Sequence, residues 1–384
     1  MLRPSRISFP RPLSAAGSAL TKQVNRPDDR GLSVLLPRRE DSDDDVMSTD
    51  RPSRTGKRGL LLLLLAVAGV LVIIGAIALV KSLHRHDSPY RVTATVPVGR
   101  GTSRVAVDPV MHAVYVANFG DHTVSVIDAK THTVTATVQV GRWPNDVAVD
   151  SGTHTVYVST STEPMSVIDG STHTVTATVG GALNGVAVDP GTHTVYAATG
   201  HDTVSVLDGS SHSVTATVPL EYPVHLAVDS GTHNVYVVNG FDDTLSVLDG
   251  STHTVTATVH VGSRVTGRND VNRGVAVDSD THTVYVAKFA DDAVSVIDGN
   301  THAVTATVHV GRSPEGVAVD PLTHTVYVTN GGDGTVSVID GKTHAVTATV
   351  HVGRGPEGVA VDPQTHTVYV ANHSDETLSV IEAR

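Results

Sequence analysis

Residues 316–357 read GVAVDPLTHTVYVTNGGDGTVSVIDGKTHAVTATVHVGRGPE, and this unit recurs along most of the chain. Its last segment, VTATV, begins at residues 92, 134, 175, 214, 255, 304 and 346, at spacings of 42, 41, 39, 41, 49 and 42 residues. Each unit contains four short runs rich in β-branched residues, namely VAVD, TVYV, TVSVID and VTATV, which are separated by turn-forming Asp-Pro, Asn-Gly and Asp-Gly pairs. A period of about 40 residues with four strands per unit predicts the blades of a β-propeller.

The two ends of the repeat region predict how the ring of blades closes. The region opens with a lone VTATV at Val92–Val96 and finishes after TLSVIE at Thr377–Glu382, with no further VTATV. The first strand is therefore expected to complete the last blade, which removes two free sheet edges. The predicted fold class is all-β, a seven-bladed β-propeller over residues 91–384 that is closed by its N-terminal strand.

The N-terminal part of the chain has a different character. Residues 1–58 are rich in Pro, Ser, Arg and Asp without apolar periodicity, so they are predicted to be a disordered tail. Residues 59–80 carry no charge and would span about 33 Å as a helix, enough to cross a bilayer core of about 30 Å. We therefore predict one transmembrane helix there, followed by a linker at 81–90. The alternative is a cleaved signal peptide that starts at Met47 and ends in the small-x-small pattern at Ala76-Ile77-Ala78.

The charge distribution bears on location and partners. Basic residues are slightly more numerous before the predicted span than after it, which favours a tail inside the cell and a propeller outside the cytoplasm. Residues 87–384 carry 13 basic and 31 acidic residues, a net charge of −18, so nucleic acid is an unlikely partner. The chain has no cysteine, which excludes disulfides, thiolate metal sites and covalently attached c-type haem. No cofactor is expected.

Histidine recurs in the turns of the repeat, most often as THTV. Seven histidines fall between the first and second strands of a unit and six between the third and fourth, each in a turn that also contains an aspartate. In an up-and-down blade these two turns emerge on the same face. A metal site needs three or four converging ligands, whereas a ring of turns spreads these histidines apart. We therefore expect structural turn residues, with weak metal binding or a pH-dependent surface charge as the alternative.

The unit resembles the YVTN family of bacterial β-propellers. The string that names the family stands at Tyr327–Asn330, with near matches at Tyr115–Asn118 and Tyr369–Asn372. The accompanying elements VGxxPxGVAVD and TVSVID match at Val310–Asp320 and Thr335–Asp340. The resemblance implies a seven-bladed propeller that lies outside the cytoplasm and binds a ligand on its loop-bearing face. Propellers of similar architecture include nitrite-reductase haem domains, quinoprotein dehydrogenase subunits and lactonases, but none of their catalytic motifs matches this chain.

The face opposite the histidines carries the loops between blades and the loops between second and third strands. Within residues 91–384, the aromatic residues other than the framework tyrosines fall in these loops. So do arginines that recur after Val-Gly or fill the long 263–273 insertion. Exposed aromatics and arginines are typical of binding hot spots. The candidate ligand-binding residues are Arg100, Phe119, Arg142, Trp143, Tyr222, Phe241, Arg264, Arg268, Arg273, Phe289, Arg312 and Arg354. An alternative role for two of these arginines is an ion pair with a nearby glutamate, Arg312 with Glu315 and Arg354 with Glu357.

Three functions are compatible with these features. The first is a membrane-anchored, extracytoplasmic binding or scaffolding propeller whose partner is another envelope macromolecule or a protein. The second is an enzyme of the lactonase or lyase kind, for which His225, Glu315 and Glu357 are the acid–base candidates near the axis. The third is a single-stranded nucleic-acid binder, which the aspartates in the same loops disfavour.

Overall fold

The computed structural model describes residues 88–384 except 182, 200–201, 241–242 and 263–273. The predicted tail and membrane span lie outside the described residues. Within the described part of the chain no helix is long and apolar enough to cross a membrane.

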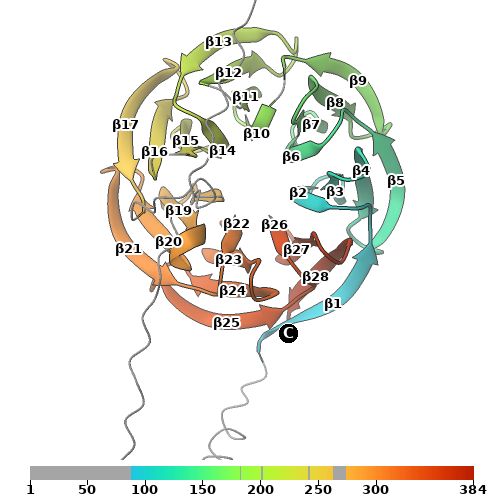
Figure 1. Cartoon of the computed structure of the whole chain (residues 1–384), viewed down its shortest axis with the longest axis vertical. Coiled ribbons are helices and arrows are strands. Elements are labelled where there is room, and N and C mark those ends of the chain that lie inside the picture. Colours follow the sequence, from blue (N-terminus) through green and yellow to red (C-terminus); the bar gives the residue numbers. More distant parts are fainter. Residues whose placement is uncertain (1–87, 182, 200–201, 241–242, 263–273) are drawn as a thin grey trace, which may run out of the picture. The chain divides into compact units, whose positions relative to one another are not determined.

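The described strands form seven four-stranded antiparallel sheets that are arranged as blades around an axis (Figure 1). Blade 1 consists of β2 (Thr102–Asp108), β3 (Ala113–Asn118), β4 (Thr123–Asp128) and β5 (Thr133–Gln139). Blade 2 consists of β6 (Pro144–Asp150), β7 (Thr155–Thr160), β8 (Met165–Asp169) and β9 (Thr174–Val179). Blade 3 consists of β10 (Leu183–Asp189), β11 (Thr194–Thr199), β12 (Thr203–Asp208) and β13 (Val214–Pro219). Blade 4 consists of β14 (Pro223–Asp229), β15 (Asn234–Asn239), β16 (Thr244–Asp249) and β17 (Thr254–His260).

The remaining three blades complete the ring. Blade 5 consists of β18 (Val275–Asp278), β19 (Thr283–Lys288), β20 (Ala293–Asp298) and β21 (Ala303–His309), with the short 3-10 helix η1 (Phe289–Asp291) between its second and third strands. Blade 6 consists of β22 (Pro314–Asp320), β23 (Thr325–Asn330), β24 (Thr335–Asp340) and β25 (Ala345–His351). Blade 7 consists of β26 (Pro356–Asp362), β27 (Thr367–Asn372), β28 (Thr377–Ala383) and β1 (Tyr90–Pro97).

Closure of the ring by the N-terminal strand is confirmed. β1 pairs antiparallel with β28, from Tyr90 opposite Ala383 to Pro97 opposite Thr377, and lies at the outer edge of blade 7. The burial of each strand follows its place in the blade. Every residue of β3 is buried, because the strand packs against neighbouring blades on both faces, whereas β5 buries only Val138.

The asparagine of the YVTN string has a structural role. The Nδ2 atom of Asn330 donates to the hydroxyls of Thr335 and Ser337, each at 3.0 Å, and its Oδ1 atom accepts from the backbone N–H of Gly311 at 3.1 Å. The side chain therefore holds two strands of blade 6 to the loop that enters the blade. The asparagine of the motif that carries the family resemblance thus has a role in the fold rather than in ligand binding.

All thirteen turn histidines adopt the left-handed backbone conformation, with φ between 52° and 61°. Histidine, like asparagine and aspartate, is enriched among non-glycine residues in this region. The two turns of a blade lie side by side, since the first residue after the third strand donates to the histidine carbonyl of the first turn, as Gly170 N does to His154 O at 2.9 Å. The histidines of both turns therefore share one face, as the sequence predicted.

Six of the seven first-turn histidines also connect adjacent blades. Their Nδ1 atoms donate to the Oδ2 atom of the matching aspartate in the preceding blade, at 2.6–2.8 Å. The six pairs are His154–Asp108, His193–Asp150, His233–Asp189, His282–Asp229, His324–Asp278 and His366–Asp320. At the interface of blades 7 and 1, Asp362 Oδ2 is buried without a hydrogen-bond partner among the described residues.

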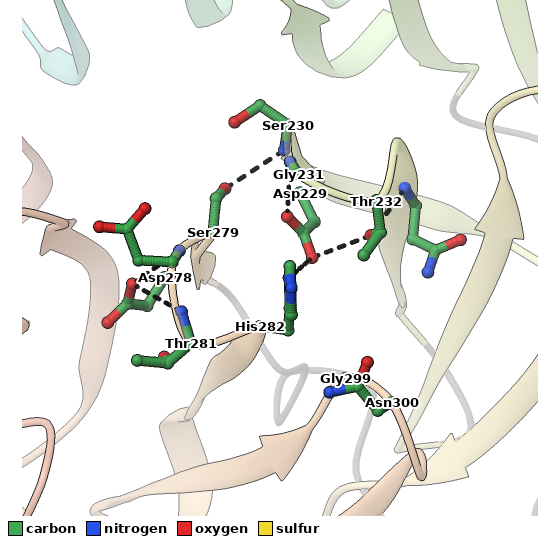
Figure 2. A network of polar contacts seen from close by, with 12 residues as sticks. Asp229, Ser230, Gly231, Thr232, Asp278, Ser279, Thr281, His282, Gly299 and Asn300 are labelled. Carbon is green, nitrogen blue, oxygen red and sulfur yellow. Dashed lines mark hydrogen bonds and ion pairs between the residues drawn. The ribbon is translucent and has the colours of Figure 1, made fainter.

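Figure 2 shows one of these connections in detail. Asp229 accepts from the N–H of Gly231 and the hydroxyl of Thr232 in its own turn, each at 2.9 Å, and from His282 of blade 5 at 2.7 Å. The Asp229 carboxylate is fully buried. One buried carboxylate therefore closes its own turn and joins two blades, which makes the histidines structural.

Framework tyrosines provide a second connection between blades. The hydroxyl of Tyr115 in blade 1 donates to the carbonyl of Gly170 in blade 2 at 3.4 Å, and burial raises the pKa of Tyr115 to about 12. Tyr327 of blade 6 differs because blade 7 is made from both ends of the chain. Its ring instead meets Tyr90 edge-on, with ring centroids 5.9 Å apart.

The aspartates of the third-to-fourth-strand turns predict how stability depends on pH. Backbone N–H groups within each turn hold the pKa of these carboxyls below its ordinary value of 3.8; they are Asp128, Asp169, Asp208, Asp249, Asp298 and Asp340. A lowered folded-state pKa contributes stability that is present above the unfolded-state value and is lost as pH falls through the folded-state value. The urea concentration at the midpoint of unfolding should therefore be lower at pH 3 than at pH 6.

Asp340→Asn provides the matched control for this loss of stability at low pH. The variant removes one of the lowered carboxyls, so its midpoint should fall less between the two pH values than that of the unaltered chain. Equal midpoints at pH 6 and pH 3 for the unaltered chain would contradict the prediction.

Candidate functional site

The face opposite the histidines is built from two kinds of loop that lie side by side. In five blades the residue after the second strand donates its N–H to a carbonyl in the loop that enters the same blade. Examples are Phe119 N to Gly101 O at 3.0 Å, Ser161 N to Trp143 O at 3.1 Å and Gly240 N to Tyr222 O at 2.9 Å. This face is called the loop face below. Rigid strands therefore fix the positions of its side chains.

The recurring arginines of the loop face form ion pairs within their own blades. Arg100 Nε lies 2.6 Å from Asp121, and its backbone N–H donates to the same carboxylate at 2.7 Å. These contacts hold the pKa of Asp121 below its usual range. The same arrangement joins Arg312 to Asp333 and Arg354 to Asp375, each at 2.6 Å, and Arg142 lies 3.6 Å from Glu163.

The expected pairing of Arg312 with Glu315 and of Arg354 with Glu357 is wrong. Asp333 and Asp375, each 21 residues further along the chain, take these places because the two loops of each blade lie together. All four arginines are exposed, and exposed pairs contribute little stability, about 0–1 kcal/mol.

Two of the predicted aromatic residues form a cluster. The rings of Phe119 and Trp143 stack with centroids 6.3 Å apart and planes at 22°, and His122 meets Trp143 edge-on at 6.2 Å. The backbone N–H of Trp143 donates to His122 Nδ1 at 3.1 Å. Trp143 is nevertheless 40% exposed. The cluster therefore presents a fixed aromatic surface to solvent.

Among the described residues, the remaining aromatic candidates make no ring contact with this cluster. Tyr222 and Phe289 are half-buried in the loops of blades 4 and 5. The candidates Phe241, Arg264, Arg268 and Arg273 lie outside the described residues.

Trp143 stands at a backbone position that favours glycine. The residue before the first strand adopts left-handed φ in five blades, and glycine occupies this position in two of them, as Gly101 (φ 62°) and Gly355 (φ 61°). The other three blades have Ser313 (φ 53°), Tyr222 (φ 46°) and Trp143 (φ 55°). A bulky side chain in this conformation costs about 1–2 kcal/mol relative to glycine. Such strain in a large exposed aromatic residue points to a functional reason for its presence.

A second departure from the repeat lies at the axis, at the position just before VAVD. Four blades have glycine there, namely Gly185, Gly274, Gly316 and Gly358. A Cβ atom on these glycines would lie 2.3–2.5 Å from a carbonyl oxygen of the next inner strand, so four inner strands approach too closely for a side chain. Blades 1, 2 and 4 instead have Arg104, Asp146 and His225.

These three side chains form a connected group in the axial channel. Arg104 donates to His225 Nε2 at 2.9 Å, and His225 Nδ1 lies 3.9 Å from Asp146. A guanidinium only donates, so Nε2 is the acceptor in this hydrogen bond. Asp146 accepts from the N–H groups of Val147 and Val186, at 2.9 and 3.2 Å.

A cavity of about 290 Å³ opens above this group; its wall includes Arg104, Phe119, Asn145, Asn184, His225, Glu315, Glu357 and His373. A narrower axial space of about 160 Å³ also includes Arg104 and His225 in its wall, together with Asp146. The structure thus brings together His225, Glu315 and Glu357, which the sequence identified as axial candidates. Among the described residues, no His, Asp and Glu side chains converge as a metal site would require.

Sequence reasoning missed Arg104 and Asp146. Aligning the seven repeats would have found them, because they replace the glycine that four other repeats have at the same place. Their meeting with His225 across the channel could not be inferred from spacing along the chain.

Comparison with known proteins supports the fold alone. No protein-family profile matches the chain, and no curated protein matches it. Among solved structures, hydrazine synthase of Kuenenia stuttgartiensis is similar, with a TM-score of 0.63 and 18% sequence identity over 73% of this chain and 95% of that one. The likeness extends to 1715 chains of solved structures, so it identifies a common architecture rather than an activity.

Proposed function

We propose that this chain is a membrane-anchored binding propeller that holds an envelope protein on its loop face, outside the cytoplasm. The apolar segment 59–80 and the resemblance to the YVTN family support the location. The observation that carries the proposal is Trp143, which is 40% exposed in a left-handed backbone conformation where two other blades have glycine. Phe119 and His122 hold the ring in one orientation, which lowers the entropy lost on binding.

The ion pairs of the loop face favour a protein over nucleic acid. Arg100, Arg312 and Arg354 are each neutralised by an aspartate at 2.6 Å, so they offer little attraction to a phosphate backbone. An exposed aromatic centre with a rim of paired charges is instead typical of protein interfaces.

The geometry at His225 does not favour the enzymatic alternative. A general base needs a free lone pair, but His225 Nε2 accepts a hydrogen bond from Arg104 at 2.9 Å. A lactonase or lyase activity is therefore not proposed.

Trp143→Gly tests the proposal because it separates binding from stability. Glycine relieves a strain of about 1–2 kcal/mol, while loss of the stacking contacts costs about 0.5–1.5 kcal/mol, so the melting temperature should change little. Affinity for a partner captured from envelope extract by the unaltered protein should fall about thirtyfold, as for a hot-spot tryptophan. Isothermal titration of the purified pair measures this.

Ser313→Gly is the matched control, since Ser313 occupies the same left-handed position in blade 6. It should leave affinity unchanged. Equal affinities for Trp143→Gly and Ser313→Gly would contradict the proposed contact.

A further inference from the structure

We propose that the cavity at the loop-face mouth of the axial channel binds a free amino acid, with the carboxylate at Arg104 and the ammonium group toward Glu315 and Glu357. This site is distinct from the Trp143 contact and goes beyond the proposed function. Its volume of about 290 Å³ lies at the lower end of ligand sites, which typically measure about 300–1,000 Å³. The ligand is therefore small.

The repeat itself shows that the axial side chains are not required by the fold. Gly274, Gly316 and Gly358 occupy the same position in three successive blades, where the inner strands pack closely. Since glycine suffices for the ring there, Arg104, Asp146 and His225 are specific additions. Arg104 and His225 place a charged, hydrogen-bonding group in the wall of the cavity, and Asp146 lies beside them in the narrower axial space.

The contacts of Arg104 indicate an anionic ligand group. Arg100, Arg312 and Arg354 each have a carboxylate at 2.6 Å, whereas Arg104 has no carboxylate within 4.0 Å among the described residues. Arg104 is partly buried, and its guanidinium donates to His225 Nε2. Five N–H donors in a partly buried cation favour a bidentate carboxylate, which supplies both the missing charge and two acceptors.

Two carboxylates in the wall of the same cavity indicate a cationic group on the same ligand. Glu315 of blade 6 and Glu357 of blade 7 line the cavity, and Glu357 lies 3.2 Å from His373. A carboxylate only accepts hydrogen bonds and an ammonium group only donates them, so Glu315 and Glu357 suit an ammonium group in this cavity. Asn145 and Asn184 donate their Nδ2 atoms to carbonyls of the next blade, at 3.3 and 3.4 Å, so their Oδ1 atoms remain acceptors for ligand N–H groups.

A zwitterion suits both Arg104 and the two glutamates, and an α-amino acid is the smallest common molecule with a carboxylate and an ammonium group on one carbon. Phe119 also lines the cavity and provides an apolar surface for the amino-acid side chain. Since Phe119 stacks on Trp143, the cavity adjoins the aromatic cluster without including its exposed tryptophan.

The test is calorimetric titration of the purified full-length protein with each free L-amino acid. For the best ligand, its amide lacks the carboxylate charge and its N-acetyl derivative lacks the ammonium group. We expect at least one amino acid to bind, and both derivatives to bind at least about tenfold more weakly, since each loses a charge-assisted contact. Failure of all free amino acids to bind, or equal binding of either derivative, would overturn the proposal.

Variants assign the binding to this cavity. Arg104→Gln should weaken binding about tenfold to a hundredfold, and Arg104→Lys, which keeps the charge, should weaken it less. Arg100→Gln is the control, because Arg100 is exposed and paired to Asp121 outside the cavity, so binding should be unchanged. Melting curves of each variant verify the fold. Undiminished binding by a folded Arg104→Gln protein contradicts the site.

The outcome is independent of the proposed protein partner. Trp143→Gly should retain amino-acid binding while losing the partner, and Arg104→Gln should show the reverse. Loss of amino-acid binding in Trp143→Gly with retention in Arg104→Gln would place the ligand elsewhere and overturn the proposal.

Discussion

A chain that begins at residue 98 is expected to lose most of its resistance to unfolding. Removing β1 deletes the pairing of Tyr90–Pro97 with β28 and exposes the edge of β28 as well as the valines beneath it. Val96 alone is 5% exposed, and full burial of a valine contributes about 1.5–3 kcal/mol. The seven residue pairs between β1 and β28 are lost as well. The free energy of unfolding should therefore fall by about 5 kcal/mol, which is comparable with the total stability of many domains.

Urea unfolding of residues 98–384 against residues 88–384 measures this loss. The shorter chain should also associate through the exposed edge, which size-exclusion chromatography detects. If both chains unfold at the same urea concentration, closure by β1 does not stabilise the ring.

Asp150→Ala should have the second-largest effect, a loss of about 3 kcal/mol. The Asp150 carboxylate is 1% exposed and accepts hydrogen bonds from Gly152 N at 3.0 Å and from His193 Nδ1 of the next blade at 2.8 Å. A hydrogen bond to a charged group contributes about 1.5–3 kcal/mol, and both donors would lose their acceptor. Chemical denaturation of the variant and the unaltered protein gives the difference.

Asp340→Ala is the control for the connection between blades. Asp340 closes a turn in the same way, through the N–H groups of Lys342 and Thr343 at 2.9 Å, but it is only half-buried. Within the described part of the chain, its carboxylate makes no hydrogen bond or ion pair with another blade. Its removal should cost clearly less than that of Asp150. Equal losses would mean that the bond from His193 contributes nothing.

The periodic features of the fold could be predicted from the sequence because they are local. The spacing of VTATV identifies the blades, and the unpaired copy at Val92–Val96 identifies the closing strand. The turn function of the histidines follows from their place beside aspartates. Their bonds to the preceding blade do not, since His193 and Asp150 are 43 residues apart and meet only when two sheets pack together.

The site was harder to predict for the same reason. Arg312 and Glu315 are close in sequence, but the chain between them turns from the loop into the first strand, so Glu315 lines the axial cavity while Arg312 remains at the rim with Asp333. Arg104 and His225 are 121 residues apart and meet only across the closed ring. The aromatic pair Phe119–Trp143 was identified by residue type, but its stacking depends on contact between the loops of blades 1 and 2.

The most direct test of the loop face as the binding face is amide hydrogen exchange of the protein with and without its captured partner. The account predicts slower exchange at residues 119–122 and 141–144 in the complex, where Phe119, His122 and Trp143 form the aromatic cluster. Exchange at residues 151–154 and 321–324, in the turns of His154 and His324, should not change. Protection of those turns with unchanged exchange around Trp143 would contradict the account.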